Sequence, residues 1–193
     1  MPQHATLFEP QAPALPEGLR LQGELITPDQ ERALVAHFAT LPFKEFEFQG
    51  FLGKRRVVSY GWQYDFNGGG LRRTEEMPAF LHPIRDKAAA FADVAPAELE
   101  HVLLTEYPPG ATIGWHKDRS VFGRVIGISL GAPAVFRLRR KAGARWERAS
   151  FTAEPRAGYL LDGPARTEWE HSIPAVPGLR HSITFRTLRE RGT

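Results

Sequence analysis

The residues best suited to chemistry in this sequence are two histidines and a carboxylate that fit one metal site. His116 and Asp118 stand two apart in a Trp-His-Lys-Asp segment, and side chains two apart on an extended strand point the same way. His171, 55 residues downstream, supplies a third donor. Two histidines and one carboxylate cover one face of an octahedron and leave the other open, which suits non-heme Fe(II). The alternative is an incidental surface turn, with His171 a hydrogen-bonded edge residue.

A second polar pattern lies near the end of the chain. Strand alternation places Arg180, Ser182, Thr184 and Arg186 on one face, with apolar side chains on the other. Two cations that face a protein interior need anions, because an unpaired buried charge is costly. A dicarboxylate would satisfy both guanidinium groups. The alternative is an edge strand with both arginines exposed and the apolar face inward.

The composition limits the class of protein and the kind of metal site. The chain has 193 residues, 42% of them hydrophobic and 24% charged, which favours one globular domain over a disordered, collagen-like or coiled-coil chain. The absence of cysteine excludes disulfides, zinc–thiolate sites and iron–sulfur clusters. No apolar run is long enough to span a membrane and no secretory signal is evident, so a cytoplasmic location is expected.

The positive charge is spread unevenly along the chain. The formal net charge is only +3, but basic residues gather at 54–56, 72–73 and 137–148. Such patches indicate contact with a polyanion more directly than the net charge does. A solvated, arginine-rich surface is the alternative, and charge alone does not choose between the two.

Hydrophobic periodicity predicts two helices followed by many short strands. Thr27, Pro28 and Gln30 form a helix start, and the apolar stripe behind them runs to Leu41. A second helix is expected over 78–92. Strands are expected over 43–48, 56–64, 101–107, 112–117, 124–130, 134–140, 149–153, 157–162, 167–171 and 181–188. This order predicts a mainly β sandwich or double-sheet barrel with flanking helices, in the α+β class.

Taken together in chain order, these motifs resemble the AlkB group of Fe(II)/2-oxoglutarate dioxygenases. The matching elements are Tyr107-Pro-Pro-Gly, His116-x-Asp118, Ser129-Leu-Gly, His171 and Arg180-x-Ser182-x-x-x-Arg186. The resemblance covers 101–188 well and 56–66 loosely. It implies a double-stranded β-helix, or jelly roll, whose larger sheet is supported by helices.

The resemblance also divides the chain into regions. A proline-rich, flexible arm over 1–18 would precede a single dioxygenase domain over 19–193. Within that domain, 19–100 would form an N-terminal extension with a substrate-recognition region at about 54–73. The remaining part, 101–188, would form the catalytic jelly-roll core.

Each polar residue of the candidate site receives a role from the resemblance. His116, Asp118 and His171 would bind Fe(II), which 2-oxoglutarate would chelate. The residues implied in binding that cosubstrate are Arg180 and Ser182 at its distal carboxylate, Arg186 nearer the iron, Tyr107 and Thr105. Thr105 and Ser182 stand where family members often have asparagine, but both keep a polar side chain.

The implied reaction consumes O2 and oxidatively decarboxylates 2-oxoglutarate to succinate and CO2 while a substrate C–H bond is hydroxylated. An N-methyl group treated in this way would leave as formaldehyde. The implied partner is an alkylated base in DNA or RNA, with no membrane and no obligate protein partner.

Residues outside the metal site are expected to hold that substrate. Trp62 and Tyr64, two apart on a strand, could both face the pocket and stack on an extruded base, or could instead lie in a packed core strand. The arginines expected at the phosphates are Arg55, Arg56, Arg137 and Arg139. Ser120 stands where the best-known repair members have a second acidic residue, which leaves RNA open beside DNA.

Three functions therefore compete. The first is a dioxygenase that demethylates or hydroxylates a base in nucleic acid, and the second is the same chemistry on a protein side chain. The third is a non-catalytic nucleic-acid-binding jelly-roll module, against which the complete set of polar motif residues argues.

Overall fold

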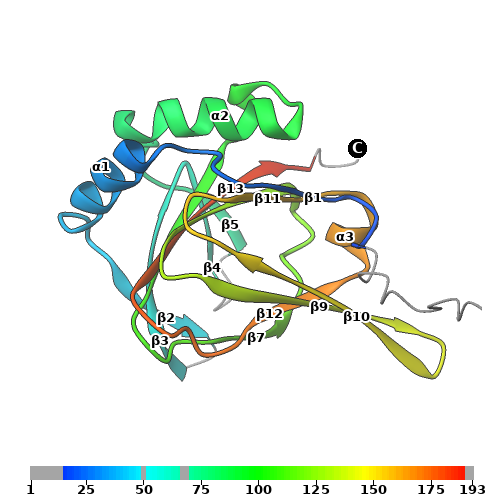
Figure 1. Ribbon diagram of the computed structural model, residues 1–193. Helices are drawn as coiled ribbons and strands as arrows, with labels where there is room; N and C mark the ends of the chain where they lie inside the picture. The colour runs from blue at the N-terminus through cyan, green and yellow to red at the C-terminus, as the bar shows by residue number, and fades with distance from the viewer. Residues whose placement is uncertain (1–14, 49–50, 66–69, 190–193) are drawn as a thin grey trace, which may run out of the picture.

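The computed structural model describes residues 15–48, 51–65 and 70–189 and shows two β-sheets packed face to face (Figure 1). The larger sheet has, in spatial order, β1 (Leu19–Gln22), β11 (Gly158–Leu161), β8 (Phe122–Gly131), β13 (Arg180–Leu188), β6 (His101–Tyr107), β3 (Phe51–Tyr60) and β2 (Lys44–Phe48). The smaller sheet has β10 (Arg145–Ala153), β9 (Ala134–Ala142), β12 (Glu170–Ile173) and β7 (Ile113–His116). A separate ribbon pairs β4 (Trp62–Asp65) with β5 (Gly70–Arg73). The predicted jelly roll with flanking helices is confirmed.

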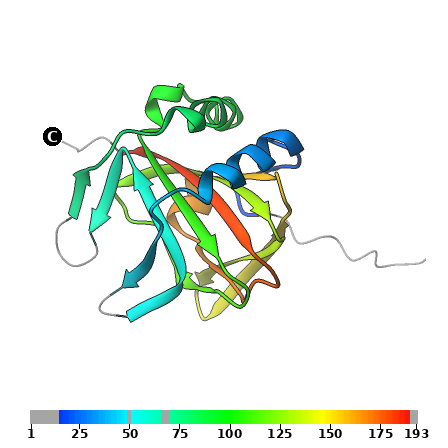
Figure 2. The same ribbon diagram turned by 90° about the vertical axis from the view of Figure 1, so that its left-hand side faces the viewer.

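Two helices lie on the outer face of the larger sheet (Figures 1 and 2). They are α1 (Pro28–Phe38) and α2 (His82–Ala92), and the short 3-10 helix η1 (Ala79–Leu81) precedes α2; a second 3-10 helix, η2 (Pro96–Glu98), follows it. Thr27 and Gln30 form the predicted capping box at α1. The Thr27 hydroxyl accepts a hydrogen bond from the Gln30 N–H at 3.2 Å, and the Gln30 side chain accepts one from the Thr27 N–H at 3.0 Å.

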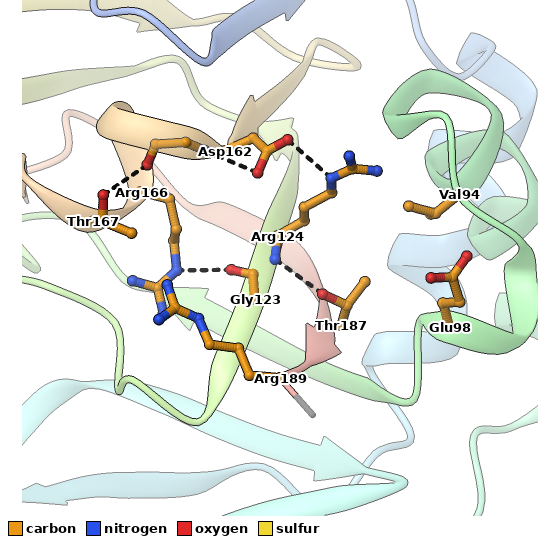
Figure 3. A pocket seen from close by; sticks show the side chains of 10 residues that line it. Val94, Glu98, Gly123, Arg124, Asp162, Arg166, Thr167, Thr187 and Arg189 are labelled. Atoms are coloured by element: carbon orange, nitrogen blue, oxygen red, sulfur yellow. Dashed lines mark hydrogen bonds and ion pairs between the residues drawn. The ribbon is translucent and has the colours of Figure 1, made fainter. Parts of the chain in front are cut away.

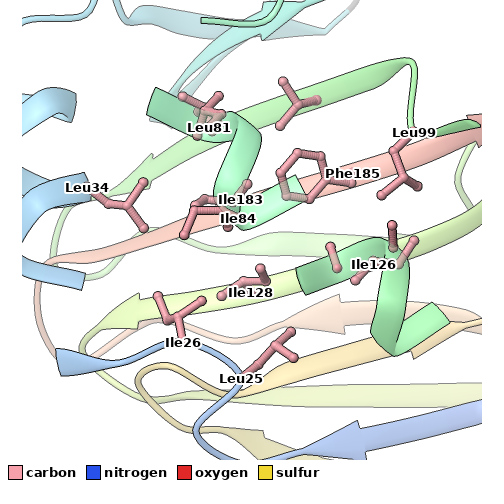
Figure 4. Packing of buried hydrophobic residues seen from close by; sticks show 14 of the residues in the cluster. Leu25, Ile26, Leu34, Leu81, Ile84, Leu99, Ile126, Ile128, Ile183 and Phe185 are labelled. Atoms are coloured by element: carbon pink, nitrogen blue, oxygen red, sulfur yellow. The ribbon is translucent and has the colours of Figure 1, made fainter. Parts of the chain in front are cut away.

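An apolar layer joins these helices to the sheet (Figure 4). Leu34 of α1 and Ile84 of α2 belong to one cluster with Ile126, Ile183 and Phe185 of the central strands. All five side chains are at most 3% exposed. Burial of each contributes about 1.5–3 kcal/mol, so this layer fixes the two strands, β8 and β13, whose other face is polar.

The two faces of β13 differ as the alternation predicts. Ile183 and Phe185 face the helices, whereas Arg180, Ser182 and Arg186 face the smaller sheet. The strand lies in the middle of the larger sheet, between β8 and β6, and all five side chains are at most 9% exposed. The alternative of an edge strand with exposed arginines is therefore excluded.

The structure differs from the prediction around residues 163–171. Instead of one strand over 167–171, Gly163–Thr167 forms the short helix α3, and β12 follows it. The cause is local: the Asp162 carboxylate accepts a hydrogen bond from the Gly163 N–H at 2.8 Å and caps the helix.

A glycine divides the strand predicted over 56–64. Gly61 has a φ of +77°, and a Cβ there would lie 1.9 Å from the Glu100 carbonyl oxygen, so only glycine fits. The alternation restarts after it. Tyr60 is buried under the helices, whereas Trp62 leaves the core with the β4–β5 ribbon.

Residues 1–14 and 66–69, which include most of the predicted arm and of the predicted glycine loop tip, lie outside the described residues. The packed chain begins before residue 19, because the carbonyl groups of Glu17 and Gly18 accept backbone hydrogen bonds of 2.9 and 3.0 Å from the α3 region. In the described part of the chain, no helix is long and apolar enough to cross a membrane.

Candidate active site

Strands β7 and β12 bring the three predicted metal ligands together. His116, the last residue of β7, is directly opposite His171 of β12, and their ring centres lie 4.3 Å apart. Asp118 follows in the next loop, and its Oδ2 lies 3.6 Å from His171 Nε2. We call His116, Asp118 and His171 the ligand triad.

Neighbouring groups orient the two imidazole rings. His116 Nδ1 lies 2.9 Å from the Gly114 carbonyl oxygen, which can only accept, so Nδ1 donates and Nε2 is the ring nitrogen left for a metal. The His171 ring stacks on Phe136, with centres 5.1 Å and planes 17° apart. These contacts leave Nε2 of His116 available as a metal ligand and hold Nε2 of His171 beside Asp118.

Two arginines hold the loop that carries Asp118. Arg186 donates from two nitrogens to Asp118 Oδ1, at 3.0 and 2.7 Å. Arg166 of α3 donates to the carbonyl oxygens of Arg119 and Phe122, each at 2.7 Å. Sequence reasoning missed Arg166, because its segment was interpreted as a loop and strand rather than a helix.

Burial and charge set the protonation of the ligand triad. Burial alone would raise the pKa of Asp118, but the surrounding cations, Arg186 first, hold that pKa well below its usual range. Burial lowers the pKa of His171 to about 3, and the neighbouring His116 adds to the shift. At neutral pH the site presents an ionised carboxylate beside a neutral imidazole, the forms that bind a divalent metal.

The donor set fits Fe(II) in its chemistry, since two imidazole nitrogens and one carboxylate form a facial set with open positions. Among residues 15–48, 51–65 and 70–189, however, no three or more His, Cys, Asp or Glu side chains are arranged to hold a metal ion as they stand. In the triad, one oxygen of Asp118 is bonded to Arg186. The fit therefore rests on the identity of the donors and on their proximity.

The inward face of the larger sheet carries a fully buried cation. Arg180 is 0% exposed, its Nε donates to Ser129 Oγ at 3.1 Å, and its guanidinium lies 4.6 Å from the Tyr107 ring centre. Its two terminal nitrogens have no hydrogen-bond partner in the described part of the chain. A buried, unpaired guanidinium is costly, so these nitrogens fit a carboxylate such as the distal group of 2-oxoglutarate.

Hydroxyl groups surround this cation. Ser182 is directly opposite Thr105 of β6 and Ser129 of β8, and all three side chains are at most 3% exposed. Arg180 is opposite Tyr107 in the same register. The structure thus places the predicted cosubstrate residues on one inward face.

Tyr159 of β11 is a buried site residue that sequence reasoning missed. Gly127 lies opposite it in β8, and a Cβ on that glycine would lie 2.1 Å from the Tyr159 ring. Burial raises the pKa of Tyr159, and Arg180 and Asp118 are among the charges that act on it. Its hydroxyl therefore stays protonated at neutral pH. The glycine opposite the tyrosine is visible only once the strand register is known.

His101, at the start of β6, was also missed. It is directly opposite Arg186, and its Nδ1 lies 3.3 Å from an Arg186 nitrogen. Because a guanidinium can only donate, Nδ1 accepts and carries no proton. Burial, with Arg186, lowers the pKa of His101 well below its usual value. His101 therefore supports Arg186, which in turn holds Asp118.

The β4–β5 ribbon brings a predicted substrate residue to the Asp118 loop. The guanidinium of Arg119, next in sequence to Asp118, lies 5.0 Å from the Tyr64 ring centre. Trp62 donates from Nε1 to Glu100 at 3.3 Å. Both rings are half-buried and lie outside the two apolar clusters of the protein, so the packed-core alternative does not hold for them.

Strand β3 separates the two arginines predicted to contact substrate. Arg56 faces outward and forms an ion pair of 2.6 Å with Glu106. Arg55 lies on the opposite face, with its guanidinium 3.9 Å from the Phe46 ring centre, and Tyr107 is near enough to affect its pKa, which burial lowers. The structure therefore brings only Arg55 toward the site, and contact of the outward-facing Arg56 with phosphates stays a prediction.

The other predicted substrate residues lie in the Asp118 loop and on the smaller sheet. Ser120 is exposed in the loop before β8. Arg137 and Arg139 lie on the outer face of the smaller sheet, because Leu138 between them is buried opposite His171 on the inner face. These two arginines therefore lie behind the metal site, and their contact with phosphates stays a prediction.

A cavity of about 390 Å³ opens beside α3, outside the ligand triad (Figure 3). Two arginines in its lining are already paired: Arg124 Nε donates to Asp162 at 2.9 Å, and Arg166 Nε donates to the Gly123 carbonyl oxygen at 2.9 Å. None of the predicted metal or cosubstrate residues lines it.

Comparison with known proteins agrees with this geometry. Residues 26–186 match the sequence profile of the 2OG-Fe(II) oxygenase superfamily, so the chain belongs to this class of iron- and 2-oxoglutarate-dependent oxygenases. It is 31% identical to the "Alkylated DNA repair protein ALKBH8 homolog" of Arabidopsis thaliana over 64% of this chain and 42% of that protein. Within this superfamily the chain is similar to AlkB proteins, and the superfamily's cofactor is Fe(II), with 2-oxoglutarate and O2 as cosubstrates.

Two further relatives differ in length. The chain is 24% identical to the "tRNA (carboxymethyluridine(34)-5-O)-methyltransferase alkbh8" of Xenopus tropicalis over 84% of this chain and 26% of that protein. It is 25% identical to an uncharacterised Acanthamoeba polyphaga mimivirus protein over 89% of this chain and 85% of that one. The chain thus spans less than half the length of the Arabidopsis and Xenopus relatives.

Solved structures support the fold. The structure of OsALKBH1 aligns with a TM-score of 0.68 at 15% identity, over 90% of this chain and 100% of the other. A Pseudomonas putida prolyl-4-hydroxylase aligns with a TM-score of 0.59 at 17% identity, over 91% and 94%. Both share the double-stranded β-helix.

Proposed function

We propose that this AlkB-like dioxygenase demethylates or hydroxylates an alkylated base in DNA or RNA. In this proposal the ligand triad holds Fe(II), which supplies activation of O2 for attack on a substrate C–H bond. One oxygen atom enters the substrate and the other enters 2-oxoglutarate, which leaves as succinate and CO2. A hydroxylated N-methyl group then leaves as formaldehyde.

The side chains around the metal bind and orient the reactants. Arg180, Ser182 and Tyr107 hold the distal carboxylate of 2-oxoglutarate, with Thr105 beside them. Arg186, supported by His101, keeps Asp118 ionised and fixed in direction. The protonated hydroxyl of Tyr159 is a donor for an anionic cosubstrate between Arg180 and Asp118.

The observation that carries the choice of a base as substrate is the position of Tyr64. The ribbon places this half-buried ring against Arg119, one residue from the metal ligand Asp118. An aromatic ring against the loop that carries a metal ligand suits a flat, extruded base, which gains about 1–3 kcal/mol by stacking. Trp62 on the same ribbon extends the aromatic surface.

A basic hairpin supports a polyanionic substrate. Residues 137–148, in the β9–β10 hairpin, hold six Lys or Arg residues and one Glu, a net charge of +5 against +3 for the whole chain. The hairpin projects from the body of the protein (Figure 1). Lys141, Arg145 and Arg148 are exposed, so their charge is available to phosphates.

Mass spectrometry of a panel of methylated DNA and RNA oligonucleotides tests the proposal. With Fe(II), 2-oxoglutarate and O2, we expect at least one modified base to lose a methyl group or gain oxygen, with one succinate formed per product. The His116→Ala variant, which lacks one metal ligand, should give neither product. The relatives named for DNA repair and for tRNA modification are the reason to include both nucleic acids.

The competing functions give different results. Succinate formed with a methylated protein or peptide and with no oligonucleotide would favour the protein-directed oxygenase. Salt-insensitive oligonucleotide binding would favour it too, because phosphate contacts release counterions and depend on salt. Oligonucleotide binding with no oxidation of any substrate would favour the non-catalytic module.

A further inference from the structure

The outer face of the smaller sheet, directly behind the ligand triad, carries stacked arginines and tryptophans. The guanidinium of Arg137 lies 5.2 Å from the Trp115 ring centre, and that of Arg139 lies 4.4 Å from the rings of both Trp115 and Trp146. We call these four residues the arginine–tryptophan ladder. It joins β7, β9 and β10 and passes over β12, which lies between β9 and β7.

Both arginines of the ladder also hold the residues on either side of His171. Arg139 is opposite Glu170 in the register and donates from Nε to its carboxylate at 2.6 Å. Arg137 is opposite Ser172 and donates to its hydroxyl at 3.1 Å, and Ser172 is 0% exposed. Each outward neighbour of His171 is therefore bonded to a guanidinium.

On β7 the ladder contacts the residue next to His116. Trp115 immediately precedes this ligand, and both guanidinium groups lie over its indole. Strand β7 has only four residues, lies at the edge of its sheet and pairs with β12 irregularly. Short edge pairings specify their register weakly, and a slip of one residue would turn His116 to the outer face.

We propose that Arg137 and Arg139 are positioning residues for the metal site. Stacked on Trp115 and bonded to β12, they fix β7 against β12 and so hold His116 and His171 at the separation that one metal ion needs. The inference rests on the proposed ligand roles. It also explains why the fold uses these arginines behind the site, where each already has a hydrogen-bond acceptor and an aromatic partner.

Metal binding without turnover tests the positioning role. In the full chain, Arg139→Gln removes the ion pair with Glu170 and the cation from between two indoles. We expect Co(II), titrated alone and followed by its visible absorption, to bind about tenfold more weakly, because groups that orient metal ligands typically contribute 10–100-fold. The absorption spectrum of bound Co(II) should also change, since it reports the ligand geometry.

Arg148→Gln is the matched control. Arg148 is directly opposite Arg139 on β10 and shares the outer face, but its side chain is exposed and makes no ion pair in the described part of the chain. This substitution should leave the Co(II) affinity and spectrum unchanged. Arg139→Lys, which can still pair with Glu170 but cannot stack as a planar group, should recover part of the affinity.

A Co(II) affinity for Arg139→Gln within twofold of the unsubstituted chain, with both folded by circular dichroism, would overturn the positioning role. If Arg139→Gln does not fold, Arg137→Gln is measured under the same twofold limit, because it loses one hydrogen bond and one stacked ring. A chain that binds no Co(II) before any substitution would overturn the proposed metal ligands, so the two failures are distinguishable.

Discussion

Arginines occur on both faces of this fold, and they differ in how they are paired. On the inward face of the larger sheet, Arg180 is 0% exposed, and in the described part of the chain its terminal nitrogens have no partner. On the outer face of the smaller sheet, Arg139 is less buried, yet it has the Glu170 carboxylate at 2.6 Å and an indole on each side.

This difference separates a ligand site from a structural contact. A buried guanidinium without an anion destabilises the fold, so it is best explained by a ligand that the fold is built to receive. A guanidinium with a carboxylate and two aromatic rings needs no ligand to explain it. In the sequence Arg180 and Arg139 look alike, because each stands two residues from another polar side chain. Only the contacts that each makes in the structure distinguish them.

The largest effect is expected where the site loses the buried carboxylate of Asp118, which pairs with Arg186. Asp118→Ala should reduce Co(II) affinity more than 100-fold, because it removes a ligand, and should lower the free energy of unfolding by about 3–5 kcal/mol, because Arg186 is left buried and unpaired. Metal titration and urea unfolding measure the two effects.

A second substitution separates these two losses. Asp118→Ala combined with Arg186→Met should recover most of the stability and none of the metal affinity. Unchanged unfolding in Asp118→Ala alone would show that Arg186 does not depend on this ion pair, and the contrast between the two faces would weaken.

Arg180→Met tests the unpaired cation. We expect affinity for 2-oxoglutarate to fall by at least about 100-fold, since two charge-assisted hydrogen bonds contribute about 1.5–3 kcal/mol each. The free energy of unfolding should stay the same or rise, because an unpaired buried charge is removed. Calorimetric titration of the Co(II)-loaded protein measures the affinity, and chemical denaturation measures the free energy of unfolding.

The Arg139→Met variant should do the opposite and lower the free energy of unfolding by about 1–2 kcal/mol. The same sign of stability change in both variants would remove the basis of the comparison.

The two buried histidines, His101 and His171, also predict how the free energy of unfolding depends on pH. The pKa values of His101 and His171 are lowered in the folded protein, that of His171 to about 3. Below pH 6.5 the unfolded chain takes up protons that the folded chain does not, so stability should fall as the pH decreases from 6.5 toward the folded pKa values. The loss is about 1.4 kcal/mol per pH unit for each histidine.

Urea unfolding between pH 7 and 5 measures this slope. The His101→Gln variant should lose about 1.4 kcal/mol per pH unit of this slope, the share of one histidine. An identical slope in His101→Gln would mean that this imidazole is not kept neutral by the fold.

Local rules in the sequence predicted much of the framework. The capping box at Thr27 fixed the start of α1, and the alternation over 180–186 separated the apolar and polar faces of β13. The motif order predicted which ligands meet, and His116 and His171 indeed lie opposite each other. These features depend on residues close in sequence or on a resemblance that spans the strands.

The features that sequence patterns did not predict depend on the register of the strands and on helix capping. Which face Arg137 and Arg139 occupy follows only once Leu138 is known to pair with His171. Tyr159 enters the site because Gly127 lies opposite it. The helix α3 forms at the turn predicted between two strands, and the Asp162 side chain caps it.

The smallest effect is expected at the exposed cations of the β9–β10 hairpin, whose role depends on a long, diffuse partner rather than a fixed ligand. Changing Lys141 and Arg145 to glutamine should weaken oligonucleotide binding a fewfold at physiological salt and reduce the salt slope by about one to two units, because each phosphate contact releases about one counterion. Co(II) and 2-oxoglutarate affinities should not change. Fluorescence anisotropy at several salt concentrations measures the slope. As a control, Arg32→Gln removes one positive charge on the outer surface of α1, and its effect is compared per charge removed. An equal loss in the control would mean that net charge, not the hairpin, attracts nucleic acid.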